Sequence, residues 1–184
     1  MNIELGTTHW YPMRVTYNRE LKVKENLDRL GIENFLPVKN KLIERSGHRK
    51  FELVPAIHNL LFVHSTRETL TGLKMTDEDF SPLRYMMTRP LDPTVRPSII
   101  HVPDLEMENF MRVASLTDDR VQFLDYAAVA NKVGRRCIII QGDLAGLEGT
   151  VKRIQGNRHV VVQLEGIIAA ALAFIPPAHL RFLE

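Results

Sequence analysis

The hydrophobic pattern is first that of a β-strand and then that of an α-helix. Residues 10–15 predict a strand in which apolar and aromatic side chains occupy both faces. Apolar residues then recur every three or four positions, which predicts a helix capped by Asn18 and continuing to Leu30. Residues 33–43 and 51–55 favour two extended segments joined by a turn, so the first third of the chain predicts both strands and a helix.

The next segments repeat this mixture. Residues 60–63 form a continuous apolar run that is typical of a buried strand. A capping-box pattern at Ser65 predicts a second helix to about Leu73, and a third helix is expected after Asp104. Residues 1–114 therefore predict an α/β sandwich with a mainly antiparallel sheet and three helices.

The last third of the chain has a different pattern. Residues 115–132 lose the clean periodicity, and we interpret them as an interdomain linker of which part packs. Residues 133–184 contain short β-type segments separated by turn residues, which predicts a small barrel of five strands. The whole chain is thus expected to be of the α+β class, with two domains.

Three glycines follow the first predicted barrel strand. Gly142, Gly146 and Gly149 lie between two β-type runs, so they predict a compact loop and a returning strand. A phosphate-binding loop is not indicated, because no Gly-Lys-Ser/Thr sequence ends the loop and a strand rather than a helix follows. This unit resembles a KOW motif, which is found in small barrels of ribosomal proteins and of NusG-type transcription factors.

Composition and charge narrow the possible partners. The chain of 184 residues is 45% hydrophobic, and its formal net charge of +2 is small for a dedicated nucleic-acid-binding protein. Basic residues nevertheless cluster between residues 39 and 50. Arg45, His48, Arg49 and Lys50 are expected at a hairpin tip, where they predict either local contact with DNA or RNA or a solvated turn.

Other classes of function lack a sequence signal. A single cysteine, Cys137, fits a reducing compartment, and neither a secretory signal nor an apolar run of spanning length is seen, so we expect a cytoplasmic protein without membrane contact. The seven histidines show no metal-ligand spacing, and no nucleophile–base arrangement is present. We therefore expect no enzymatic activity, no metal and no cofactor.

The order of the two halves is similar to that of NusG-type transcription factors. The first half contains Trp10-Tyr11-Pro12-Met13-Arg14-Val15, a helix, and Gly31-Ile32-Glu33-Asn34-Phe35-Leu36-Pro37. With the KOW-like unit at the other end, the resemblance covers nearly the whole chain. It implies an N-terminal domain that binds RNA polymerase and suppresses pausing or termination. It also implies a barrel that recruits a partner such as the termination factor Rho or a ribosomal small-subunit protein.

The resemblance also implies a polymerase-binding patch. Its candidate residues are Trp10, Tyr11, Ile57, Leu60 and Phe62. For each of them, packing in the domain core is the alternative interpretation. The family usually has an aromatic residue followed by Pro-Gly-Tyr at this point, where the present chain has Ile57, His58-Asn59 and Leu60.

This departure favours a specialised paralogue that serves a particular long operon, for example one for surface polysaccharides. A silencer and an activator fit the sequence equally. An alternative from another class is a KOW-containing ribosome- or RNA-binding protein, against which the near-neutral charge argues. We expect a monomer.

The segment from Ile167 to Phe174 leaves one structural alternative open. It is rich in alanine, which favours helix over strand. Some specialised relatives hold their C-terminal domain as a helical hairpin until they are recruited, and a strand of small residues is the other possibility here.

Overall fold

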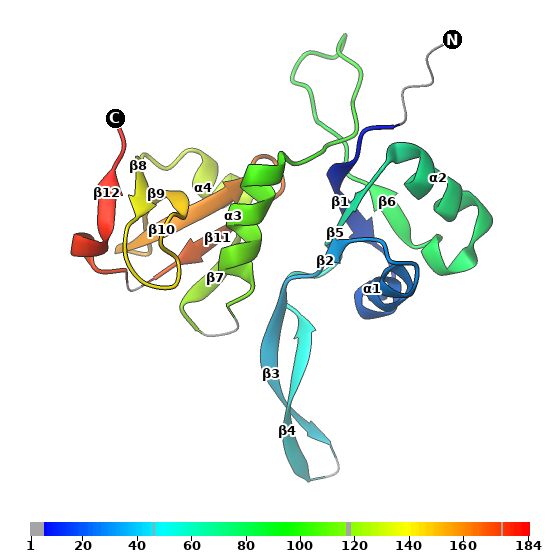
Figure 1. Cartoon of the computed structure of the whole chain (residues 1–184), viewed down its shortest axis with the longest axis horizontal. Helices are drawn as coiled ribbons and strands as arrows, with labels where there is room; N and C mark the ends of the chain where they lie inside the picture. Colours follow the sequence, from blue (N-terminus) through cyan, green and yellow to red (C-terminus); the bar gives the residue numbers. More distant parts are fainter. Residues whose placement is uncertain (1–5, 46, 117–118, 174) are drawn as a thin grey trace. The chain divides into compact units, whose positions relative to one another are not determined.

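A computed structural model describes residues 6–45, 47–116, 119–173 and 175–184 (Figure 1). Ser46 of the expected turn and Phe174 of the alanine-rich segment lie outside the described residues. The chain divides into two compact units. The first comprises Met1–Pro37 and Ile57–Asp104, and the second comprises Val38–Ala56 and Leu105–Glu184. These units do not coincide with the expected ranges, since the residues of the predicted hairpin and of the third helix group with the barrel strands.

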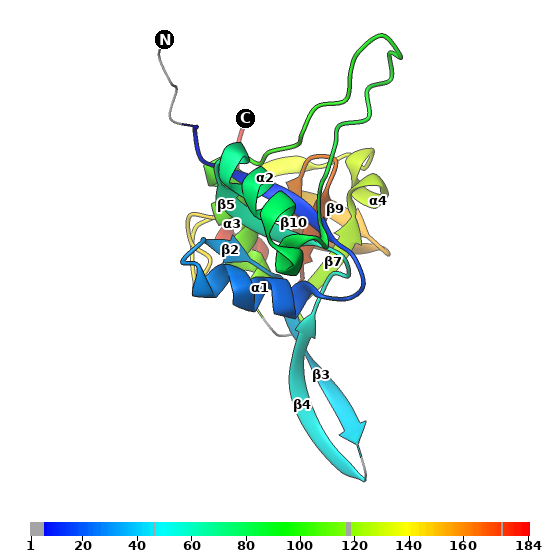
Figure 2. The same ribbon diagram turned by 90° about the vertical axis from the view of Figure 1, so that its right-hand side faces the viewer.

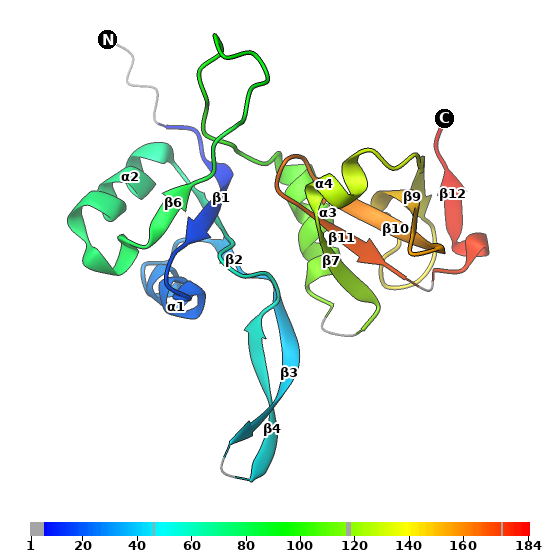
Figure 3. The same cartoon turned by 180° about the vertical axis from the view of Figure 1, so that it is seen from behind.

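The first unit contains a four-stranded antiparallel sheet. Its strand order is β2-β5-β1-β6. The strands are β1 (His9–Val15), β2 (Asn34–Phe35), β5 (Leu61–Ser65) and β6 (Leu83–Tyr85). Helices α1 (Glu20–Arg29) and α2 (Arg67–Thr76) lie on the same side of this sheet, as Figures 1 and 3 show.

The core of this unit follows from the alternation in β1. Met13 is paired with Leu61, and both side chains are fully buried, as are Val23 and Leu27 of α1 and Leu70 of α2. A short 3-10 helix, η1 (Glu78–Phe80), adds the buried ring of Phe80. One sheet face thus supplies the apolar layer on which the amphipathic helices pack.

The helix starts differ by one residue from those that the sequence predicts. The backbone of Asn18 has a φ of 52°, and Arg19 holds the N-cap position of α1 without a side-chain cap. The expected cap at Asn18 is therefore wrong. For α2 the cap is Thr66 rather than Ser65, because the Thr66 hydroxyl accepts a hydrogen bond from the Thr69 amide.

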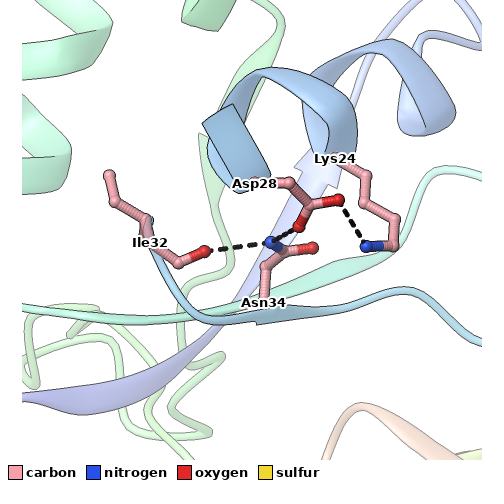
Figure 4. A network of polar contacts seen from close by, with 4 residues as sticks. All are labelled: Lys24, Asp28, Ile32 and Asn34. Atoms are coloured by element: carbon pink, nitrogen blue, oxygen red, sulfur yellow. Dashed lines mark hydrogen bonds and ion pairs between the residues drawn. The ribbon is translucent and has the colours of Figure 1, made fainter. Parts of the chain in front are cut away.

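The exit from α1 is fixed by a polar network (Figure 4). The Asp28 carboxylate accepts hydrogen bonds from Lys24 Nζ at 2.8 Å and from Asn34 Nδ2 at 2.7 Å. Asn34 Nδ2 also donates to the Ile32 carbonyl oxygen at 3.0 Å. Gly31, with a φ of 68°, provides the left-handed residue that ends the helix, so the chain turns directly into β2.

Strands β3 (Val38–Arg45) and β4 (His48–Pro55) form a separate two-stranded antiparallel hairpin. Figure 2 shows it as a twisted ribbon. Its register pairs Val38 with Pro55 at one end and Arg45 with His48 at the tip. Within the described residues each of these strands pairs only with the other.

The second sheet has six antiparallel strands in the order β12-β8-β9-β10-β11-β7. Five of them follow residue 133, which is the number of strands expected there: β8 (Arg135–Ile139), β9 (Glu148–Ile154), β10 (Asn157–Leu164), β11 (Ile168–Leu172) and β12 (Leu180–Phe182). A 3-10 helix, η2 (Pro177–His179), precedes β12. Helix α3 (Asp104–Ala114) precedes this sheet in the chain and completes the three expected helices.

The sixth strand, β7 (Val121–Asp125), comes from the range expected to be a linker. It pairs with β11 from Ile168↔Asp125 to Leu172↔Val121, and a short helix, α4 (Tyr126–Ala130), follows it. Val129 of α4 packs with Val161 and the alanines of β11. Residues 121–130 are therefore ordered, because β7 pairs with β11 and Val129 packs against one face of this sheet. With helices and antiparallel sheets in both units, the α+β class is confirmed.

Strand β11 explains the alanine-rich segment. All of its residues, from Ile168 to Leu172, are buried. Ala169 and Ala171 contact the layer of Val129 and Val161, while Ala170 lies on the other face of the strand. Small side chains are needed here since the strand is buried on both sides, and within this segment the structure shows Ile168–Leu172 as a strand.

Candidate functional site

Trp10 and Tyr11 lie on opposite faces of the first sheet. Trp10 stacks on His64 with ring centroids 4.9 Å apart, and Tyr11 meets Tyr85 edge to face at 5.7 Å. Each keeps only 5% of its surface exposed. Both aromatic residues are therefore packed within the chain, and they do not form one joint surface.

The surroundings of Tyr11 belong to the helix-covered face. Burial raises the pKa of its hydroxyl above the ordinary value of 10.0, and the neighbouring Tyr85 and Glu68 raise this pKa further. Glu68 is in the first turn of α2. Tyr11 thus points toward the helices, which gives it a role in the core of the first unit.

The other candidate residues surround the loop before β5. Asn59 adopts a φ of 60°, and its backbone N–H donates a hydrogen bond to the buried carboxylate of Glu20 at 2.7 Å. Asparagine tolerates this left-handed conformation better than most residues, so it can make the turn that leads into β5. Leu60 and Phe62 are buried, whereas Ile57 is half-buried. Ile57 is the accessible apolar side chain among the five candidates.

The β3–β4 hairpin has two different faces. Residues that pair directly across an antiparallel ladder share a face, and successive pairs alternate between the two. The pairs Lys39↔Val54, Lys41↔Glu52, Ile43↔Lys50 and Arg45↔His48 form what we call the basic face. The pairs Val38↔Pro55, Asn40↔Leu53, Leu42↔Phe51 and Glu44↔Arg49 form what we call the apolar face.

The predicted nucleic-acid-binding residues divide between these faces. Arg45, His48 and Lys50 lie together on the basic face, and all three are exposed. Arg49 lies on the apolar face, where its Nε donates to the Glu44 carboxylate at 2.9 Å. Lys50 is 2.6 Å from the carboxylate of Glu52, which lowers the pKa of that carboxyl group. The hairpin thus gathers three of the four predicted residues and separates the fourth.

Several hairpin residues were not among the predicted site residues. Lys39 and Lys41 extend the basic face along β3, and both are exposed. On the apolar face, Leu42, Phe51 and Leu53 are 50%, 73% and 55% exposed. The sequence carries part of this signal, since Lys39, Lys41 and Arg45 are separated by even numbers of residues and a period of two separates the faces of a strand.

The glycine loop of the barrel uses its glycines in two ways. Gly142 and Gly146 adopt φ values of 83° and 85°, the left-handed conformation that a tight loop requires. Gly149 lies in β9, where an added Cβ would be 2.8 Å from Val160 Cγ1 and 3.1 Å from the Val161 carbonyl oxygen. The loop is held by α3, since Arg112 donates to the Ala145 carbonyl oxygen at 2.8 Å.

Two kinds of site are not found in the described parts of the chain. No group of three or more His, Cys, Asp or Glu side chains is arranged to hold a metal ion there. None of the helices in those parts is long and apolar enough to cross a membrane.

Comparison with known proteins identifies the family. Residues 8–111 match the family described as "Transcription termination factor nusG". No curated protein matches the sequence. Among solved structures, the chain is similar to one described as "Domain interaction in Thermotoga maritima NusG". The two share 17% sequence identity with a TM-score of 0.45, and the match covers 97% of this chain and 98% of the other. Because the family match spans more than half of the sequence, the chain belongs to the NusG family of non-enzymatic transcription elongation and termination factors, which interact with RNA polymerase.

Proposed function

We propose that this protein binds RNA polymerase during elongation and suppresses pausing or termination. The observation that carries the proposal is the two-faced β3–β4 hairpin, which exposes apolar side chains on one face and basic side chains on the other. A factor on a transcribing polymerase meets both a protein surface and nucleic acid. The hairpin offers chemistry that suits each of them.

The apolar face fits a protein partner. Phe51 and Leu42 are directly opposite each other and half or more exposed, so their burial in a complex would remove apolar surface from water. At about 25 cal/mol per Å², this burial would make a favourable contribution to binding. Aromatic side chains in the centre of an interface contribute more than most others, which places Phe51 first among the expected contacts.

The basic face fits phosphate groups. Lys39, Lys41 and Arg45 lie on this face of β3, with Ile43 between the last two and with Lys50 and His48 beside them on β4. Among the described residues of this face the one carboxylate is Glu52, which is paired with Lys50. An exposed row of cations attracts nucleic acid independently of its sequence. We assign Arg49 a smaller part because it lies on the other face of the hairpin.

We propose a further polymerase contact at the sheet region that contains Trp10, Tyr11, Ile57, Leu60 and Phe62. Ile57 is its centre in this proposal, since a side chain must be accessible to bind a partner. The packed residues of this set would maintain the shape of the surface around it. The KOW-like barrel would recruit the second partner, either Rho or a ribosomal small-subunit protein, and the protein would serve a particular operon as a monomer in the cytoplasm.

Direct binding tests the proposal. The full chain is expected to co-purify with core RNA polymerase, and Leu42→Ser combined with Phe51→Ser should weaken this binding at least tenfold. Leu91→Ser is the matched control, because Leu91 is fully exposed in a different segment and should leave binding unchanged. Co-purification with ribosomes instead of polymerase, lost at high salt, would contradict the proposal and favour a ribosome-binding protein.

A further inference from the structure

The barrel sheet contains a cavity of about 480 Å³ at one end. Its floor is a row of apolar side chains on neighbouring strands, since Val160 of β10 pairs with Leu172 of β11 and with Val151 of β9. Leu180 and Phe182 of β12 form part of the wall. The glycines of the KOW-like loop do not line it. The cavity is therefore a feature of the barrel distinct from that loop.

The rim of the cavity is basic. Arg135, Arg153, Arg158 and His159 line it, and the described lining includes no carboxylate. Arg153 and Arg158 are directly opposite each other in the β9–β10 ladder, where like charges repel. Within the described residues neither of them has an ion-pair partner. Two adjacent cations without counter-charges favour an external anionic group.

A buried lysine lies on the other face of the same strands. Lys152 is only 6% exposed, and its Nζ donates to the Val129 carbonyl oxygen at 2.8 Å and to Gln163 Oε1 at 3.1 Å. Both acceptors are neutral, and burial lowers the pKa of this lysine. Its pairing with His159 in the β9–β10 ladder places it on the sheet face opposite to Arg153 and Arg158, so these two arginines are the cations that an anionic ligand in the cavity would meet.

The chemistry of the lining side chains indicates whether the ligand of this cavity is a peptide or a nucleic acid. Bases are bound by aromatic stacking and by polar groups that read their edges. Here the lining side chains are aliphatic or basic apart from Phe182 and His159, and they include no amide or hydroxyl. The ring of Phe182 is already covered on one side by the Arg135 guanidinium, 4.4 Å from its centroid. An apolar side chain fits the floor better than a base.

We propose that this cavity binds an acidic protein segment that inserts one apolar side chain between flanking carboxylates. The apolar side chain would contact Val151, Leu180 and Phe182, which keep accessible surface above the buried Val160 and Leu172, and the carboxylates would pair with Arg153 and Arg158. The proposal rests on the recruiting role proposed for the barrel, and it gives the chemistry of the recruited partner.

The test uses the full chain and a nine-residue peptide that has a central leucine with four aspartates on each side. Titration followed by NMR should shift the backbone amides around Val151, Val160 and Phe182 in a saturable way. The same peptide with serine in place of leucine should bind about tenfold more weakly, and Arg153→Glu combined with Arg158→Glu should reduce affinity by at least about tenfold. Arg181→Glu is the control, since Arg181 lies on β12 but does not line the cavity.

Three results would overturn the proposal: equal binding of the leucine and serine peptides, stronger binding of a nine-nucleotide oligouridine at the same amides, or no saturable shift at about 1 mM peptide. The exposed arginine substitutions should leave the spectrum of the free protein dispersed, which verifies folding. Polymerase binding by the same arginine variant separates the two proposals. If it is retained while peptide binding is absent for the wild type, the cavity proposal alone fails.

Discussion

The β3–β4 hairpin and strand β11 differ in how much of their apolar side chains is exposed. The hairpin leaves Leu42, Phe51 and Leu53 half or more exposed, whereas β11 buries all of its residues and fills both of its faces with small or aliphatic side chains. A side chain that contributes little to folding can still be retained for contact with a partner. The comparison therefore predicts that mutations in the barrel affect stability and that mutations in the hairpin affect binding.

The largest effect is expected for a core leucine of the barrel. Leu164 is fully buried in β10, so Leu164→Ala should lower the free energy of unfolding by about 2–5 kcal/mol through lost burial and a cavity. Leu42→Ala in the hairpin should change it by no more than about 0.5 kcal/mol. Urea unfolding of both variants measures the difference. Equal losses would mean that the hairpin is part of the folding core.

The glycines sharpen the same comparison. Gly149→Ala should cost about 1–3 kcal/mol, because the new methyl group would press on Val160 and on the Val161 carbonyl group. Gly47→Ala meets no atom within 4 Å and strains only a residue with a φ of 77°, so we expect a cost of about 1 kcal/mol. Thermal unfolding compares the stability of the two variants. A greater loss of stability in Gly47→Ala than in Gly149→Ala would contradict this prediction.

The two faces of the hairpin can be separated by charge. Lys41→Gln combined with Lys50→Gln should weaken binding to duplex DNA and reduce the slope of log K against log salt by about 0.9 for each phosphate that the variant no longer neutralises. Arg49→Gln removes one charge from the other face and should change the slope less. Fluorescence anisotropy at several salt concentrations provides the measurement. An unchanged slope in the double variant would remove the basic face from the proposal.

The smallest effect concerns alkaline stability of the barrel. Burial raises the pKa of the Cys137 thiol above its ordinary value of 9.0, so the folded state favours the neutral thiol. The contribution of the neutral thiol to the free energy of unfolding is fully present below pH 9.0, and it is lost as the pH rises through the raised pKa of the folded state. Lys152, whose pKa is lowered by burial, acts in the opposite sense. Its contribution to the free energy of unfolding decreases as the pH falls, because the unfolded state then binds more protons than the folded state.

Comparison of the wild type with Cys137→Ala isolates the thiol. The difference in unfolding free energy between the two proteins should shrink above pH 9.0 and stay constant below it. Chemical denaturation at pH 7, 9 and 10 provides the measurement. A constant difference at all three pH values would show that the thiol does not titrate on unfolding.

The sequence predicted those parts of the fold that depend on regular periodicity. β1, α1, α3 and the barrel strands were expected from apolar spacing, because one face of each meets a core. The cap at Asn18 was not predictable in this way, since Arg19 holds that position without a side-chain hydrogen bond. The order in residues 121–130 depends on a distant partner, β11, which local patterns do not reveal.

The candidate site was predictable only in part for a similar reason. Charge clustering identified Arg45, His48 and Lys50, yet the separation of Arg49 required the register of the hairpin. Aromatic residue types identified Trp10 and Tyr11, and the period of a strand placed them on opposite faces, but only the fold shows that both are packed. Sequence alone reveals which residues are apolar, and the fold determines which of them remain exposed.

Single-round transcription elongation tests the central claim most directly. The full chain is added to a halted RNA polymerase complex on a template with a pause site and a Rho-dependent terminator. We predict that the wild-type protein shortens the pause or increases read-through, that Leu42→Ser combined with Phe51→Ser abolishes this effect, and that Leu91→Ser retains it. An elongation effect that persists undiminished in the hairpin variant, or no effect of the wild type on either signal, would contradict the account.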